Sequence, residues 1–187
     1  STWNQCLRSV DHLGSATGVL EANAAFSGAT NLTDVPEHIP TSITTANLMF
    51  KGAVNLNDPD VSKWSVSNVT DMNSMFMGAS KFNQPLNGWN VSNVTKMNSM
   101  FENASSFNQP LNSWNTSKVT EMQYMFRNAS SFNQSLASWS TSNVTDMHMM
   151  FYGAPYSQDL STWNLDKVSR MAMMFNNPDA FNGNIQR

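Results

Sequence analysis

Cysteine is nearly absent from this chain of 187 residues, because Cys6 is the only one. The sequence therefore has no disulfide framework and no cysteine-based metal site. Charged residues are also scarce, at 12%, and the net charge is −3. The sequence has no basic patch, which argues against nucleic acid or an anionic membrane surface as a partner. No apolar run approaches the roughly 20 residues that a membrane-spanning helix requires, so we expect no membrane insertion.

A pattern of about 25 residues repeats along the chain. Its tryptophan marker recurs with spacings of 25, 25, 25 and 24 residues, at Trp64, Trp89, Trp114, Trp139 and Trp163. A fixed period in the twenties predicts a solenoid in which each repeat is one coil and neighbouring coils build the core. A repeated surface suits binding or spacing better than a unique catalytic pocket. Since no nucleophile, phosphate-loop or paired-carboxylate motif is visible either, we expect no enzyme.

The first half of each repeat has helical spacing. Val69, Met72, Met75 and Phe76 stand at i, i+3, i+6 and i+7, which predicts one face of a helix of about two turns. The residue two places after the Phe is one that tolerates a left-handed conformation and would end the helix. These residues are Gly78, Asn103, Asn128 and Gly153.

The second half of each repeat carries Phe82, Leu86 and Trp89 with polar residues between them. Pro85 excludes a long central strand here, so the segment is predicted to be a short strand or extended segment. Together the two halves predict an α/β solenoid with one short helix and one short strand or extended segment per coil.

The repeat divides the chain into two parts. Residues 1–25 do not fit the pattern and are predicted to form an N-terminal cap, and residues 26–187 form the solenoid. Trp89 follows Phe82 by seven residues, so the next Trp after Phe181 is due at position 188, one beyond the last residue. We therefore expect a truncated last repeat in a fragment of a longer protein, or a last coil that something else covers, such as another chain stacked end to end.

The segment from Trp89 to Phe101, followed by Ala104 and Phe107-Asn108-Gln109, resembles the bacterial surface-protein repeat of about 25 residues. That repeat also occurs in surface lipoproteins and is similar to BspA-like leucine-rich repeats. The resemblance covers residues 26–187, and it implies a right-handed leucine-rich-repeat-like solenoid that acts in adhesion or ligand binding, extracellular or at the cell surface. It brings no catalytic residues. The sequence departs from the pattern at Pro155, with one residue deleted before Trp163.

Several repeated positions allow both a structural and a binding interpretation. The Met and Phe positions are interpreted as core, with a hydrophobic ligand groove as the alternative. The Trp positions are either core or a platform for sugars. The Asn and Gln positions, such as Asn83 and Gln84, either form a ladder of amides between coils or bind a ligand. Charged positions one period apart predict exposed ion pairs, at Asp71–Lys96, Lys96–Glu121 and Glu102–Arg127.

The positions that vary between repeats are the candidate binding face, because specificity needs variation. One group follows the buried Leu and another precedes the buried Phe. The first is Asn87, Gly88, Asn112, Ser113, Ala137 and Ser138, and the second is Lys81, Ser106 and Ser131.

Metal and cofactor sites are not expected. His12, His38 and His148 lie far apart in the repeat. Asp58 and Asp60 form a small acidic turn whose oxygens could bind calcium, although it lacks the glycine and the distal acid of an EF-hand loop.

The sequence thus predicts a non-enzymatic cell-surface module that binds a protein, peptide or glycan through a lateral face of the solenoid. Two alternatives remain. One is a structural spacer in a longer surface protein. The other is an ice-binding solenoid, for which Thr70, Thr95, Thr120 and Thr145 form a file.

Overall fold

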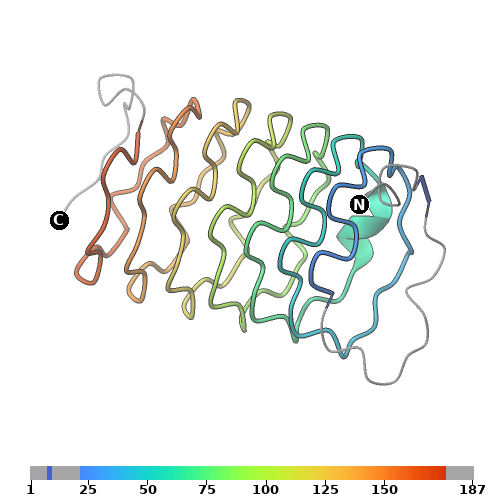
Figure 1. The fold of residues 1–187 in the computed structure, drawn as a ribbon. Helices are drawn as coiled ribbons and strands as arrows, with labels where there is room; N and C mark the ends of the chain where they lie inside the picture. Colours follow the sequence, from blue (N-terminus) through green and yellow to red (C-terminus); the bar gives the residue numbers. More distant parts are fainter. Residues whose placement is uncertain (1–7, 10–21, 176–187) are drawn as a thin grey trace.

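The computed structural model of the chain describes residues 8–9 and 22–175. Its coils stack side by side in chain order, as Figure 1 shows, so the predicted solenoid is formed. The one regular element of the described residues is η1, a 3₁₀ helix at Pro59–Lys63. It begins where the Asp58 carboxylate accepts the Asp60 N–H at 3.0 Å, with proline in its first turn.

Neighbouring coils are joined by backbone hydrogen bonds along the segment that starts at Asp71. Isolated parallel β-bridges connect equivalent residues, in the order Thr45, Asp71, Lys96, Glu121, Asp146 and Arg170. Beyond the bridge, alternate N–H groups donate to the next coil. Met72 donates to the Lys96 carbonyl at 3.0 Å, and Ser74 donates to the Asn98 carbonyl at 2.9 Å.

The helix predicted over Val69 to Phe76 is not formed. Ser74 has a φ of +54°, which breaks a right-handed helix, and the Met75 N–H closes a tight turn to the Met72 carbonyl at 3.2 Å. The segment is a run of turns, because the N–H groups of Met72, Ser74 and Phe76 bond to the next coil instead of to residues four places back. The helical spacing therefore predicted the buried side chains correctly, but the helical backbone conformation predicted from it is wrong.

The left-handed conformation predicted two places after the Phe is confirmed. Gly78 and Gly153 have φ values of +73° and +76°, and Asn103 and Asn128 have +59° and +56°. These residues end a turn and not a helix. The second half of the coil is irregular, and no strand is assigned in residues 8–9 or 22–175.

The repeated apolar side chains form one continuous core. Met100, Phe101 and Phe107 are fully buried, and so are their equivalents in the inner coils. The rings of Phe101 and Phe107 stack within one coil at 4.0 Å, and Phe101 stacks on Phe126 of the next coil at 5.6 Å. Such aromatic pairs add about 0.5–1.5 kcal/mol each to the burial energy. The core interpretation of the Met and Phe positions is therefore confirmed.

Of the predicted cap at residues 1–25, the structure describes Arg8, Ser9 and residues 22–25. Ala22 and Ala24 donate their N–H groups to the Thr45 and Asn47 carbonyls at 2.9 and 2.8 Å, as in the coils that follow. The cap and the predicted truncated repeat otherwise lie outside the described residues, as do Cys6, His12 and Phe181.

Candidate functional site

The nine predicted face residues lie in turns on either side of the buried Phe and Leu. Two of them, Asn87 and Ala137, are half-buried, and the other seven are exposed. Some of their polar groups form hydrogen bonds between neighbouring coils. The Ser113 N–H donates to Asn87 Oδ1 at 2.9 Å, and the Ser138 hydroxyl donates to the Asn112 carbonyl at 2.6 Å. The Lys81 ammonium likewise donates to Asn55 Oδ1 at 2.7 Å. The binding role of these nine residues stays a prediction.

The amides between these two groups form the expected ladder. Asn83 Oδ1 accepts the Asn108 N–H at 3.0 Å and the Gln109 side-chain amide at 3.2 Å. Asn108 Oδ1 receives the same pair of bonds from the following coil, at 3.0 and 3.1 Å. The structural interpretation of the Asn and Gln positions is thereby confirmed.

The tryptophans belong to the core. Their exposed fractions are only 2–3%, and the indole N–H of Trp114 donates to the Leu86 carbonyl at 2.8 Å. Trp64, Trp89, Trp139 and Trp163 donate in the same way. With both faces and the N–H group covered, these rings offer no platform for a sugar.

The threonine file also bonds along the array. The hydroxyl of Thr95 donates to the Thr70 carbonyl at 3.1 Å, and that of Thr120 donates to the Thr95 carbonyl at 3.2 Å. Each of these hydroxyl groups therefore has a protein acceptor within hydrogen-bond distance. The ice-binding hypothesis stays a prediction, which thermal hysteresis would test.

A second face, which we call the turn face, lies along the bridged segment. It is made of the positions equivalent to residues 71, 73, 74 and 77, which the sequence assigned to a helix. At the position of Ser74, every described coil has a positive φ, from +52° to +60°. The residues there are Ala24, Leu48, Ser74, Ser99, Tyr124, Met149 and Met173. The sequence signal for this face was the variation at this position, which the helix assignment hid.

Large side chains gather at one end of the turn face. The rings of Tyr124 and His148 meet edge to face at 5.3 Å, and the Arg127 guanidinium lies 5.6 Å from the centre of the Tyr124 ring. Tyr152 is half-buried one turn beyond Met149. Met173, in the following coil, is 61% exposed. The corresponding positions of the earlier coils hold mostly Ser and Asn.

Two ion pairs join coils on the turn face. The predicted Arg127–Glu102 pair is confirmed, at 3.1 Å, and Arg170 pairs with Asp146 at 3.0 Å. Between Lys96 and either Asp71 or Glu121, all in the described segment, no ion pair within 4 Å is formed. Those three residues are connected through backbone bridges instead.

The acidic turn is occupied by protein contacts. Asp58 Oδ2 accepts the Val35 N–H at 2.7 Å, and Asp60 pairs with Lys63 at 2.8 Å. Within the described segments no group of three or more His, Cys, Asp or Glu side chains could hold a metal ion. A calcium ion at Asp58 and Asp60 would have to displace the Lys63 ammonium, and it stays a prediction.

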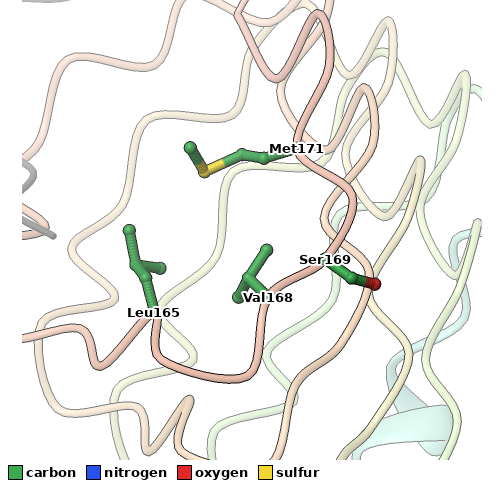
Figure 2. Close-up of a pocket in the computed structure, with 4 residues that line it drawn as sticks. All are labelled: Leu165, Val168, Ser169 and Met171. Carbon is green, nitrogen blue, oxygen red and sulfur yellow. The ribbon is translucent and has the colours of Figure 1, made fainter.

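A small cavity opens at the last described coil. Figure 2 shows Leu165, Val168 and Met171 around it, with Ser169 on its edge. The equivalent Val144 of the preceding coil is fully buried, because the following coil covers it. End-to-end stacking would use this apolar edge. It stays a prediction, since the chain beyond residue 175 lies outside the described part.

Comparison with known proteins identifies both a family and a fold. Residues 20–135 and 111–187 match the family described as "Mycoplasma protein of unknown function, DUF285". The structure resembles that of a leucine-rich repeat protein from Bacteroides ovatus, with a TM-score of 0.50 and 12% sequence identity. The likeness covers 98% of this chain and 51% of that one, so this chain spans about half of that protein's length. No curated protein matches the sequence significantly.

At this identity the likeness establishes the fold alone. The leucine-rich-repeat-like solenoid predicted from the sequence is thereby supported. The specific relation to BspA-like surface repeats stays a prediction. Within the described residues, no helix has the length and apolar character needed to cross a bilayer.

Proposed function

We propose that this chain, which belongs to the family described as "Mycoplasma protein of unknown function, DUF285", is a non-catalytic interaction module. The proposal is based on its solenoid fold. In this proposal it binds a protein, peptide or glycan, extracellular or at the cell surface, through one side of the stacked coils. Solenoids suit this task, because stacking builds a long continuous surface from short units.

The contrast between adjacent positions of the repeat carries the proposal. The position of Met100 is methionine from Met49 to Met174, and its side chain is buried in every one of these coils. The neighbouring position of Ser99 changes from serine to tyrosine and methionine. The position of Met100 is held constant by packing. The position of Ser99 is buried where it holds Ser74 or Ser99, but it is half-buried at Tyr124 and Met149 and exposed at Met173, so the larger side chains there can contact a partner.

Glycan and peptide arrays probed with the purified chain test the function. A binding module should retain a restricted set of ligands, and soluble ligand should compete for each of them. Paired charge substitutions, Asn112→Lys with Ser138→Lys, then test the sequence-predicted polar face against the turn face. A structural spacer would give a clean negative on every array, and that result would count against the proposal.

The location is tested separately. Brief protease treatment of intact cells that produce the natural protein should remove this domain from the cell fraction. A cytosolic protein serves as the control and should remain intact. Protection of the domain until the cells are lysed would contradict a surface location.

A further inference from the structure

The large side chains at the end of the turn face form a cluster, which we call the aromatic patch: Tyr124, His148, Met149, Tyr152 and Met173. Backbone hydrogen bonds hold its coils in register. The Tyr124 N–H donates to the His148 carbonyl at 2.9 Å, and the Met149 N–H donates to the Ala172 carbonyl at 3.0 Å. The patch therefore spans three consecutive coils as one surface.

The fold does not require these side chains. Tyr124, Met149 and Met173 all have a positive φ, of +60°, +52° and +54°. A left-handed conformation costs a bulky residue about 1–2 kcal/mol, and glycine or asparagine tolerates it better. Ser74 and Ser99 fill the same position in two central coils. Large side chains held at unfavourable backbone positions indicate a use for the side chains themselves.

The charges beside the patch are arranged unevenly. In the Arg127–Glu102 pair, the arginine side chain is 38% exposed and the glutamate 8%. In the Arg170–Asp146 pair, the values are 65% and 12%. Both carboxylates are thus turned inward, while both guanidinium groups are presented to solvent. Each guanidinium uses one terminal nitrogen in its pair. The Nε of Arg127 is buried, so the other terminal N–H groups are the donors that remain for a carboxylate of a partner.

We propose that the aromatic patch binds a protein segment in which carboxylates stand beside apolar side chains. The inference rests on the proposed function and names the partner class and the site. Tyrosine, methionine and arginine are enriched in protein interfaces, where the apolar groups supply buried area and the guanidinium groups supply orientation.

Other partner classes fit the patch less well. The Tyr124 ring is half-buried, meets the His148 ring edge to face and has the Arg127 guanidinium over one face, so it is a less open stacking platform for a sugar than an isolated ring. Nucleic acid would require a basic surface, but the chain has a net charge of −3. A peptide needs only apolar contact and a few hydrogen bonds to carboxylates, and the patch and its two arginines provide both.

A random twelve-residue peptide library, displayed on phage and selected on the immobilised whole chain, tests the proposal. Selected peptides should combine Asp or Glu with Leu, Ile, Phe or Trp. Synthetic copies are then titrated by fluorescence polarisation. Their affinity should fall at least about tenfold in the double variant Tyr124→Ser with Met149→Ser, because interface anchors dominate binding energy. It should also fall with added salt, since the arginine contacts are partly exposed.

The chain offers a matched control for the double variant. Leu48 has the same positive φ, +59°, in a coil outside the patch. Leu48→Ser therefore changes the same backbone position and should leave peptide affinity unchanged. Both variants introduce serine, which already occupies this position at Ser74 and Ser99, so we expect the fold to persist. Circular dichroism of each variant tests whether it is folded.

The outcomes separate the patch from the general function. Failure to select any peptide, selected peptides without acidic residues, or equal affinity for the double variant would each overturn the patch assignment. An array ligand could lose binding in Asn112→Lys with Ser138→Lys but not in Tyr124→Ser with Met149→Ser. That result would support the proposed function and contradict the assignment of the binding site to the aromatic patch. If arrays and library both return nothing, the proposed function falls as well.

Discussion

Among single residues, Tyr156 is the irregular member of a buried aromatic column that otherwise holds Phe82, Phe107 and Phe132. Its side chain stacks on Phe151 at 4.0 Å and is 3% exposed. Its hydroxyl is buried and makes no hydrogen bond of normal geometry to the described residues, although the backbone of Leu136 lies near enough to interact with it. Since an unsatisfied buried hydroxyl costs about 1–3 kcal/mol, Tyr156→Phe should raise the free energy of unfolding by about 1 kcal/mol or more. Urea titration measures it, and a loss of stability would contradict this interpretation.

The same residue predicts a pH effect. Burial raises the pKa of Tyr156 in the folded chain, while the unfolded chain releases this proton near the ordinary value of about 10. The folded state therefore binds the proton more tightly, and stability is lost as the pH rises above about 10. Melting temperatures measured from about pH 8 to pH 11 should fall less in Tyr156→Phe. The other tyrosines are common to both proteins and cancel in the comparison.

At the scale of the element, the turn after each Phe depends on a residue that accepts a positive φ. Gly78 has a φ of +73°, so Gly78→Ala should destabilise the chain by about 1 kcal/mol. Gly78→Asn should cost less, because Asn103 and Asn128 occupy the equivalent turns.

Gly88 is the matched control for this turn. It lacks a positive φ, and an added Cβ would meet nothing within 4 Å. Gly88→Ala should therefore leave the free energy of unfolding within about 0.5 kcal/mol of the parent. Thermal melts of the three variants decide the matter, and equal effects at Gly78 and Gly88 would refute the role given to φ.

At the scale of the whole molecule, each coil is stabilised mainly by its neighbours. A substitution that destabilises one coil should therefore also destabilise the coils beside it. Phe101 is fully buried and stacks on Phe76 at 5.7 Å and Phe126 at 5.6 Å. Phe101→Ala should cost about 3–5 kcal/mol, because it leaves a cavity in the middle of the core. Hydrogen exchange should show the amides of the central coils losing protection before those of the outer coils.

A substitution at the edge of the array provides the comparison. Phe175 stacks on Phe151 at 5.7 Å and is half-buried in the last described coil. Phe175→Ala should cost less than Phe101→Ala, and its loss of protection should be confined to nearby coils. Uniform loss of protection in both variants would mean that the array unfolds as one unit.

Much of the solenoid could be predicted from the repeat, because burial is recorded directly in residue type. A position that is Met at 72, 97, 122 and 147 must face the same environment in each coil, and the structure places all four in the core. The ladder of amides and the left-handed turn residues were predictable for the same reason. Each depends on chemistry that recurs at one position of every coil.

The backbone of the first half-coil and the location of the turn face were decided only by the tertiary structure. Val69, Met72, Met75 and Phe76 have the spacing of a helix, but spacing reports which side chains are buried and not where an N–H group finds its acceptor. The Ser74 N–H bonds to the Asn98 carbonyl, which exists at that place only when the next coil is stacked there. That same stacking brings Tyr124 to His148 across a coil boundary. The sequence determined the period, the core and the solenoid, whereas contacts between coils, made by residues about 25 apart, determined the backbone path and the face that it presents.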